Sequence, residues 1–313
     1  MPIRDGYIIA ESIDGPAPLS TRGHVSNTLV PDEFELPDDW WQTAVAVERL
    51  LKHFRKHVVG LFIRGRSPSD YQSYLYTGFL IQFKDQQLWV SAGHVIDQVK
   101  AALTTPEFVV EETRWMDTYE DQHLPSAPAY LRETKPNMKS WSEEGTDFGA
   151  IVLSLMDRAS LAANKEILVL SLANKSQRGS NLPEGYYVLG YPDEIKDHKK
   201  EIRADRKMHN KLVASLACLP IRRIEPPTDL ERHEFWNDAN GFYAKVLPFS
   251  DRPNARIPDI PGMSGGPTLS IEQDENKQFR YHLVGIQCRW MRSLETIRGV
   301  SVEKARELLD AWI

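Results

Sequence analysis

One short stretch carries most of the functional information in this chain: Gly262-Met263-Ser264-Gly265-Gly266-Pro267. It places a single serine between glycines, which adopt backbone conformations that other residues avoid and leave the hydroxyl accessible. A serine hydroxyl is a weak nucleophile at neutral pH, so it needs a base within hydrogen-bond reach and a third group that orients the base. If Ser264 is a nucleophile, a histidine and an acid must stand elsewhere in the sequence.

The candidate base is His94, one of nine histidines in the chain. It follows an apolar strand pattern at residues 88–93 that ends on small residues, and we expect the end of this strand to hold the imidazole rigidly. The candidate acid is Asp147, which stands before a second buried strand pattern at residues 148–153. Three acids nearby in the sequence remain rivals for this role: Glu143, Glu144 and Asp157.

Three separated segments of the chain resemble the trypsin/chymotrypsin-like serine peptidases, in the order that this family shows. The family signatures T-A-A-H-[CV], D-[IL]-A-[LV]-L and G-[DN]-S-G-G-P correspond to residues 91–95, 147–151 and 262–267. With weaker likenesses at residues 76–81, 190–192 and 284–286, the resemblance spans about residues 57–300. It implies an all-β fold of two six-stranded antiparallel β-barrels, similar to intracellular bacterial-type members that have no PDZ domain.

The resemblance also implies a mechanism. Ser264 would attack a carbonyl carbon, His94 would accept its proton and later deliver it to the leaving amine, and Asp147 would orient the imidazole. The backbone amides of Gly262 and Ser264 would form the oxyanion hole. This chemistry requires no metal and no organic cofactor, and it takes a protein or peptide as substrate.

We expect five parts along the chain. The first is an irregular arm followed by an amphipathic helix, and the last is a C-terminal helix; between them lie two barrels and a linker. Their expected bounds are residues 1–56 for the arm and helix, 57–164 for the first barrel with His94 and Asp147, 165–182 for the linker, 183–300 for the second barrel with Ser264, and 301–313 for the final helix.

Helical periodicity supports both terminal helices. Apolar residues recur at helical spacing from Trp40 to Phe54, which predicts a helix capped by Asp38 or Asp39 and packed on the first barrel. Ser301 is the expected N-cap of the last helix, which should pack on the second barrel. His53 and His57 have a metal-compatible spacing but lack a third ligand, so we interpret them as a helix end.

Short apolar runs between turn signals predict the strands. They are expected at residues 57–63, 75–83, 88–91 and 148–155 in the first barrel, and at 185–191, 211–224, 242–248, 267–271 and 281–290 in the second. Two polar segments, residues 106–139 and 196–211, are interpreted as insertions. The second is expected to be a solvated loop or short helix, with a partner-docking surface as the alternative.

Composition places the chain among ordinary globular proteins and limits its partners. Of 313 residues, 41% are hydrophobic and 26% are charged, and the formal net charge is −6, which provides no basic field for DNA or RNA. No apolar stretch is long enough to cross a membrane. Two cysteines and the absence of a secretory leader favour a cytoplasmic location.

Two positions depart from the family pattern. Met263 stands where secreted relatives carry an aspartate that pairs with a new N-terminus, so we expect constitutive activity or gating by the arm, by the insertions or by a regulatory protein partner. The substrate pocket is also unusual, because Asp259 would favour basic side chains and Arg289 acidic ones. The expected pocket residues are Pro258, Asp259, Gln287, Cys288 and Arg289.

Two other functional interpretations were weighed. The G-x-S-x-G pattern also fits the nucleophile elbow of α/β-hydrolases, but that fold places its acid and histidine after the serine. Here too little chain follows Ser264, with His282 as its only histidine. The alternative from another class is a protease-like scaffold that binds a peptide or signalling partner without cutting it.

Overall fold

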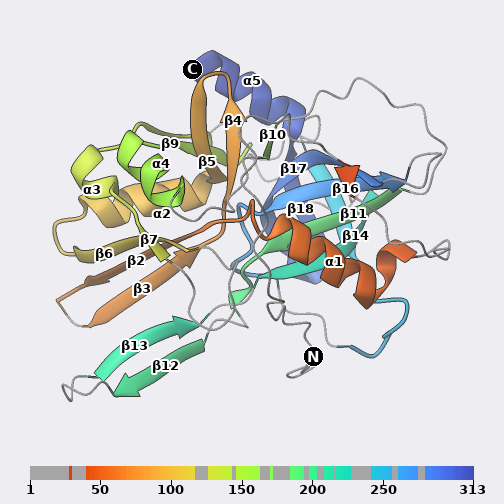
Figure 1. The fold of residues 1–313 in the computed structure, drawn as a ribbon, viewed down its shortest axis with the longest axis horizontal. Coiled ribbons are helices and arrows are strands. Elements are labelled where there is room, and N and C mark those ends of the chain that lie inside the picture. The colour runs from red at the N-terminus through yellow and green to blue at the C-terminus, as the bar shows by residue number, and fades with distance from the viewer. Residues whose placement is uncertain are drawn as a thin grey trace.

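The computed structural model describes most of the two folded halves of the chain (Figure 1). No helix among the described residues is long and apolar enough to cross a membrane. The described residues are 28–29, 40–68, 70–116, 126–142, 146–162, 170–171, 184–193, 197–202, 208–213, 216–226, 241–255, 260–273 and 279–313.

The C-terminal half contains a closed six-stranded antiparallel barrel. Its strands follow one another in the order β17-β16-β11-β14-β15-β18, and pairing of β18 with β17 closes the ring. The short strand β1 (Thr28–Leu29) adds to the outer edge of β17. The barrel strands are β11 (Glu184–Gly190), β14 (Ala217–Ile224), β15 (Gly241–Val246), β16 (Pro267–Gln273), β17 (Phe279–Met291) and β18 (Thr296–Ser301).

The N-terminal half is not confirmed as the expected closed barrel, because its described strands lie in two sheets that an isolated bridge between Val58 and Phe79 connects. A five-stranded sheet has the order β10-β4-β5-β9-β8, and a four-stranded sheet has the order β3-β2-β6-β7. The strands are β2 (Gly60–Arg66), β3 (Tyr71–Tyr76), β4 (Phe79–Phe83), β5 (Gln86–Ala92), β6 (Val109–Met116), β7 (Ser126–Pro128), β8 (Met138–Ser140), β9 (Phe148–Val152) and β10 (Leu170–Ser171).

The two N-terminal sheets meet at a corner at Thr77 and Gly78, where the sequence predicted one continuous strand at residues 75–83. The backbone amide of Val59 donates to the carbonyl of Gly78 at 2.9 Å, and the amide of Leu80 donates to the carbonyl of His57 at 3.0 Å. A side chain at Gly78 would collide with Trp89, since an added Cβ would lie 2.3 Å from the indole. The corner therefore turns the chain from β3 into β4 beside a buried tryptophan.

The segment at residues 106–139 is not an insertion. Its strand β6 pairs along the whole length of β2, and Trp115 in β6 is fully buried. The segment also contributes β7, β8 and the short helix α3 (Leu131–Thr134). The second segment interpreted as an insertion, residues 196–211, lies largely in an antiparallel hairpin of β12 (Asp197–Ile202) and β13 (Met208–Val213).

The helices exceed the two that were expected. Helix α1 (Ala44–Phe54) follows a 3₁₀ turn (Trp40–Gln42) and is capped by Thr43, whose hydroxyl accepts from the amide of Ala46, and not by Asp38 or Asp39. It contacts β14 of the closed barrel, so the prediction that it packs on the first half is wrong. The remaining helices are α2 (Gly93–Thr104), α4 (Leu155–Ala162), a 3₁₀ turn (Arg292–Leu294) and α5 (Val302–Trp312).

The predicted C-terminal helix, with Ser301 as its N-cap, is confirmed. The Ser301 hydroxyl accepts from the amide of Lys304, and α5 contacts β17 and β18 of the closed barrel. Its last turn also reaches the first half of the molecule, because the Trp312 ring meets the Trp141 ring edge-on at 5.8 Å. The helix therefore helps to hold the two halves together around the site described below.

Candidate active site

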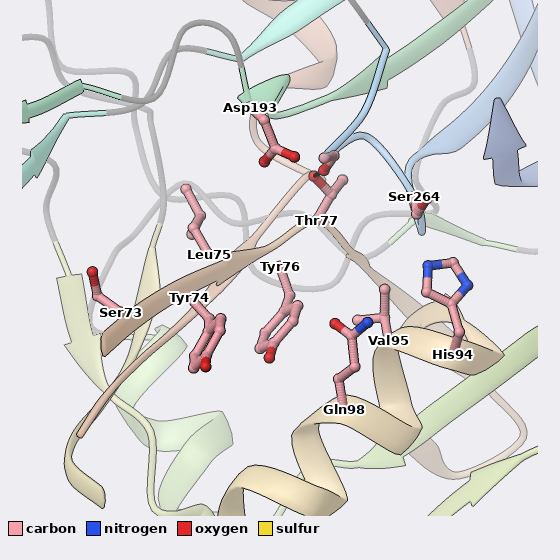
Figure 2. Close-up of a pocket in the computed structure, with 11 residues that line it drawn as sticks. Ser73, Tyr74, Leu75, Tyr76, Thr77, His94, Val95, Gln98, Asp193 and Ser264 are labelled. Atoms are coloured by element: carbon pink, nitrogen blue, oxygen red, sulfur yellow. Dashed lines mark hydrogen bonds between the residues drawn. The ribbon is translucent and has the colours of Figure 1, made fainter. Parts of the chain in front are cut away.

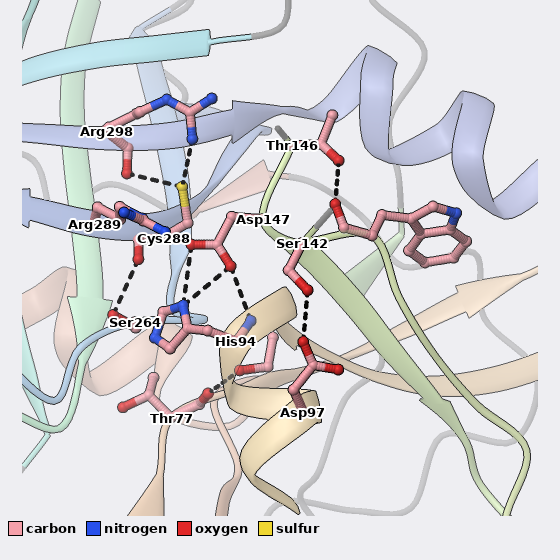
Figure 3. Close-up of polar contacts among 12 residues, drawn as sticks. Thr77, His94, Asp97, Ser142, Thr146, Asp147, Ser264, Cys288, Arg289 and Arg298 are labelled. Carbon is pink, nitrogen blue, oxygen red and sulfur yellow. Dashed lines mark hydrogen bonds and ion pairs between the residues drawn. The ribbon is translucent and has the colours of Figure 1, made fainter. Parts of the chain in front are cut away.

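The structure brings His94 and Asp147 into direct contact (Figure 3). The Nδ1 atom of His94 lies 3.0 Å from each carboxylate oxygen of Asp147. One of these oxygens also accepts the backbone amide of His94 at 2.9 Å. The Asp147 side chain is only 6% exposed, whereas that of His94 is 35% exposed. The carboxylate is thus buried behind an imidazole that can be reached from outside.

Helix α2 explains how this contact arises. His94 lies in the first turn of α2, two residues past the end of β5, so a helix start follows the strand end at which the sequence pattern placed it. The first amides of a helix lack internal partners and carry partial positive charge, so a carboxylate is favourable there. Asp147 supplies that carboxylate from the residue before β9 and adopts a left-handed conformation, with φ 52°. One acid thus caps the helix and orients the imidazole.

Asp147 is held as a carboxylate. Burial by itself would raise its pKa, but the hydrogen bonds and charge of His94, together with the charge of Arg289, lower that pKa below its usual value. The Nε atom of Arg289 lies 3.4 Å from a carboxylate oxygen, and its side chain is half exposed. The carboxylate of Asp147 therefore contacts both the imidazole of His94 and the guanidinium of Arg289, which lies in β17.

The loop that carries Ser264 depends on two glycines in the left-handed region. Gly262 has φ +92° and Gly265 has φ +97°. An added Cβ at Gly265 would lie 2.0 Å from the Ser91 hydroxyl oxygen and 2.3 Å from the Thr77 carbonyl oxygen. The Gly265 amide donates to the carbonyl of Gln287 at 2.7 Å, which ties the loop to β17. Both glycines are thus required by conformation, and Gly265 also by its close approach to the first half.

Thr77 was not assigned a role from the sequence, although it lies within a segment that resembles the family. Its hydroxyl donates to the carbonyl of Gly262 at 2.7 Å and accepts from the amide of Tyr191 at 3.0 Å. Its own carbonyl accepts the buried hydroxyl of Ser91 at 2.7 Å. Thr77 therefore links the corner of the first half to the loop of the second half that carries Ser264, and only the tertiary structure shows these partners.

Ser264 lies beside the imidazole but makes a different hydrogen bond. Its hydroxyl donates to the carbonyl of Cys288 at 3.2 Å. The edge of the His94 ring that Asp147 does not use faces Ser264 (Figure 3). Among the described residues, the backbone amides of Gly262 and Ser264 have no hydrogen-bond acceptor. Within the described part of the chain, no acceptor therefore competes for these two donors.

His94 and Ser264 line one open pocket of about 510 Å³ (Figure 2). Thr77 and Gly262 form part of its wall, and Asp193 contributes a carboxylate against Gly262, where an added Cβ would lie 2.4 Å from the Asp193 oxygen. The pocket continues past His94 between β3 and α2. It can therefore admit an extended substrate to the serine and the imidazole together.

The residues expected to form the substrate pocket differ in their exposure to solvent. Gln287 and Cys288 are buried, with 1% and 0% exposed, whereas Arg289 reaches Asp147 as described above. Burial raises the pKa of the Cys288 thiol to about 12, so this thiol stays neutral. Pro258 and Asp259 lie outside the described residues.

The side chain of Met263 supports the loop that carries Ser264. It is fully buried in an apolar cluster with Val188, Leu219 and Ile260. Burying a methionine side chain contributes about 1.5–3 kcal/mol. Apolar packing of Met263 thus holds this loop in place.

Of the three rival acids, Asp157 is the one that the structure describes, and it is bonded away from His94. Asp157 is fully buried at the start of α4, where it accepts from Trp115 Nε1 at 2.9 Å and from the amide of Tyr130 at 2.8 Å. Glu143 and Glu144 lie outside the described residues. Within the part of the chain that the structure describes, no group of three His, Cys, Asp or Glu side chains could hold a metal ion.

Comparisons with known proteins add only distant similarities. No protein-family model matches the sequence, and no curated protein is significantly similar to it. Many solved structures match the fold, among them three at low identity. The protease Anisep from Arthrobacter nicotinovorans has 14% identity, a TM-score of 0.44, and coverage of 80% of this chain and 93% of its own.

A structure described as GrC has 11% identity and a TM-score of 0.45, with coverage of 83% of this chain and 95% of its own. A structure from a study of the coupled folding and binding of the Sesbania mosaic virus VPg protein has 10% identity and a TM-score of 0.40, covering 81% and 90%. These values are too low to assign a family, so the function has to be argued from the site itself.

Proposed function

We propose that this chain is a serine endopeptidase of the trypsin/chymotrypsin-like type, in which Ser264, His94 and Asp147 form the catalytic triad. The observation that carries the proposal is the carboxylate of Asp147, with both oxygens 3.0 Å from Nδ1 of an imidazole that shares a pocket with Ser264. A carboxylate on Nδ1 places the proton there and leaves Nε2 free to accept one. The substrate is a protein or peptide.

In the proposed reaction, rotation of the Ser264 side chain from the carbonyl of Cys288 brings its hydroxyl to Nε2 of His94. In structures without substrate such hydrogen bonds are often long or misaligned and tighten only when substrate binds. As Ser264 attacks the carbonyl carbon of the peptide bond, His94 takes its proton. When the tetrahedral intermediate collapses, the imidazolium gives this proton to the leaving amine, and water then cleaves the acyl-enzyme by the same steps.

The amides of Gly262 and Ser264 supply the oxyanion hole in this proposal. Both are without an acceptor among the described residues, so they are available to the oxygen that gains charge. Loss of one such donor costs about 100- to 1000-fold in turnover in comparable enzymes. Thr77 acts as a positioning residue here, since its hydroxyl fixes the carbonyl of Gly262.

Labelling with a fluorophosphonate probe tests the proposal, because this reagent reacts with activated serine hydroxyls. We expect covalent labelling of the wild-type protein that disappears in Ser264→Ala and falls strongly in His94→Ala. His282→Ala is the matched control, because His282 also pairs with a carboxylate, that of Glu272 at 3.2 Å, but lies outside the site. Labelling that persists in Ser264→Ala would refute the assignment of the nucleophile.

A second candidate function is a protease-like scaffold that binds a peptide or signalling partner without cutting it. The hydrogen bond from Ser264 to Cys288, at 3.2 Å, favours this reading, because it leaves the hydroxyl unactivated. The probe separates the two candidates. A scaffold binds peptide but is not labelled at any peptide concentration, whereas an enzyme gated by substrate or by a regulatory partner becomes labelled when that ligand is added.

A further inference from the structure

A second pocket continues the first one away from the proposed triad. It measures about 480 Å³ and lies between β3, the later turns of α2 and the segment before β6. Tyr74, Tyr76 and Gln98 line both pockets, so the two form one continuous groove. Figure 2 shows the rings of Tyr74 and Tyr76 side by side, with Gln98 across from them on α2.

Three aromatic rings form a row along this groove. The rings of Tyr74 and Tyr76 are stacked, with centroids 6.0 Å apart and planes at 11°. The ring of Phe108 meets that of Tyr74 at 5.9 Å and 64°. Tyr74 is 37% exposed, which leaves one side of the row open to a ligand. An extended peptide rises about 3.3 Å per residue, so this row spans roughly three to four residues of a bound segment.

The charges that line the groove have one sign. Among the described residues that line it, the charged ones apart from His94 are Asp193, beside the loop that carries Ser264, and Glu107, beside the distal ring. Glu107 is exposed, and no lysine or arginine of the described part of the chain lines either pocket. A ligand with apolar side chains flanked by basic ones is therefore complementary to the groove, whereas an acidic ligand meets two like charges.

The position of His94 fixes which side of a substrate enters. The leaving amine must receive its proton from His94, so the segment that follows the cut bond departs over the imidazole. The groove begins at His94 and runs along Gln98, one turn further on α2. The aromatic row is thus reached from the leaving-group side of the scissile bond.

Building on the proposed function, we propose that the groove binds the substrate segment C-terminal to the cut bond and selects aromatic or aliphatic side chains followed by lysine or arginine. Tyr74, Tyr76 and Phe108 supply the apolar contacts, and Glu107 pairs with the basic side chain at the distal end. This segment, and not only the residues before the cut, then determines which peptides are cleaved.

The test uses pairs of internally quenched peptides that share one sequence before the cut bond. One peptide carries an aromatic residue and then arginines after the cut, and the other carries serine and then glutamates. A small ester with the same acyl part and no peptide leaving group serves as the reference substrate. Tyr74→Ala and Glu107→Lys alter the groove, and Tyr71→Ala is the matched control, since Tyr71 is 54% exposed on the same strand but lines neither pocket.

We expect Tyr74→Ala to lower kcat/KM for the aromatic-basic peptide roughly 3- to 10-fold, as loss of an aromatic contact predicts, and to leave the ester within about 2-fold. Glu107→Lys should reverse the preference between the two peptides. Equal kcat/KM for both peptides in the wild type, or equal effects of Tyr74→Ala and Tyr71→Ala, would overturn the inference.

Binding separates a failure of this inference from a failure of the proposed function. The same two peptides, labelled with a fluorophore, are titrated into Ser264→Ala and into the double variant with Tyr74→Ala. Selective binding that depends on Tyr74, with no hydrolysis by the wild type, refutes the peptidase and retains the groove. Hydrolysis without any preference between the peptides retains the peptidase and refutes the groove.

Discussion

Replacing Thr77 by valine tests whether contact between the two halves holds the nucleophile loop in place. The side chain is fully buried, and its hydroxyl makes two hydrogen bonds, to the carbonyl of Gly262 at 2.7 Å and from the amide of Tyr191 at 3.0 Å. Valine has nearly the same shape but neither donates nor accepts. The substitution therefore leaves a carbonyl and an amide unsatisfied without opening a cavity.

The expected loss of stability follows from these two groups. A buried donor or acceptor left without a partner costs about 1–3 kcal/mol, so with two such groups Thr77→Val should lower the free energy of unfolding by roughly 2–6 kcal/mol. Thr77→Ser keeps the hydroxyl and removes one buried methyl group, which costs about 1 kcal/mol. The two variants thus separate the hydrogen bonds from the apolar packing at one position.

Two measurements check this prediction. Urea unfolding followed by tryptophan fluorescence gives the change in stability, and the rate of fluorophosphonate labelling reports the geometry around Ser264. We expect Thr77→Val to be labelled at least about 10-fold more slowly, which corresponds to about 1.4 kcal/mol of lost positioning. The reasoning fails if Thr77→Val retains wild-type labelling and stability, or if Thr77→Ser is damaged as much as Thr77→Val.

Three further substitutions probe the site. Gly265→Ala should abolish labelling, because φ is +97° and the added Cβ would lie 2.0 Å from the Ser91 hydroxyl oxygen; wild-type labelling would contradict this. Asp147→Asn should lower kcat roughly 10⁴-fold at neutral pH, because an amide no longer favours the required tautomer; a steady-state assay that shows less than a 10-fold loss would contradict it. Arg289→Gln removes one of the causes that lower the pKa of Asp147 below its ordinary 3.8, so this pKa should rise. The stability that the ionised carboxylate contributes should then be lost at a higher pH on acidification. Unfolding midpoints measured across acidic pH would show this shift, and identical profiles for the two proteins would refute it.

Local patterns in the sequence predicted those features that depend on local forces. The final helix and its Ser301 cap need only a helical period and one hydroxyl, and both were predicted. The first helix was predicted from the same kind of period, but the period also runs through the 3₁₀ turn at Trp40–Gln42, so it placed the cap before Thr43. The period identified the buried face of α1 but could not identify β14 as the surface that this face meets.

Composition misled where a strand carries charges on one face. Residues 106–139 were interpreted as a polar insertion because of their acidic side chains, yet β6 lies in the sheet with Val110 and Trp115 buried. On its outward face Glu112 lies opposite Arg64 of β2, and the two charges are 3.0 Å apart. Cross-strand pairs of opposite charge stabilise a sheet, but the partner of Glu112 is distant in sequence and the local pattern does not contain it.

The strand that closes the barrel, β18, also depends on a partner that the local sequence pattern does not contain. Strand β18 was not predicted, because its sequence Thr296–Ser301 has Arg298 at its centre, and arginine is rarely buried unless it is paired. Here Arg298 is 2% exposed, its guanidinium lies 3.5 Å from Cys288 Sγ, and its carbonyl accepts that thiol at 3.3 Å. Cys288 belongs to β17, which pairs with β18 to close the ring. Arg298 is thus buried where the barrel closes, and Cys288, which it contacts, lies at the register shift between the two strands and accepts the Ser264 hydroxyl on its carbonyl.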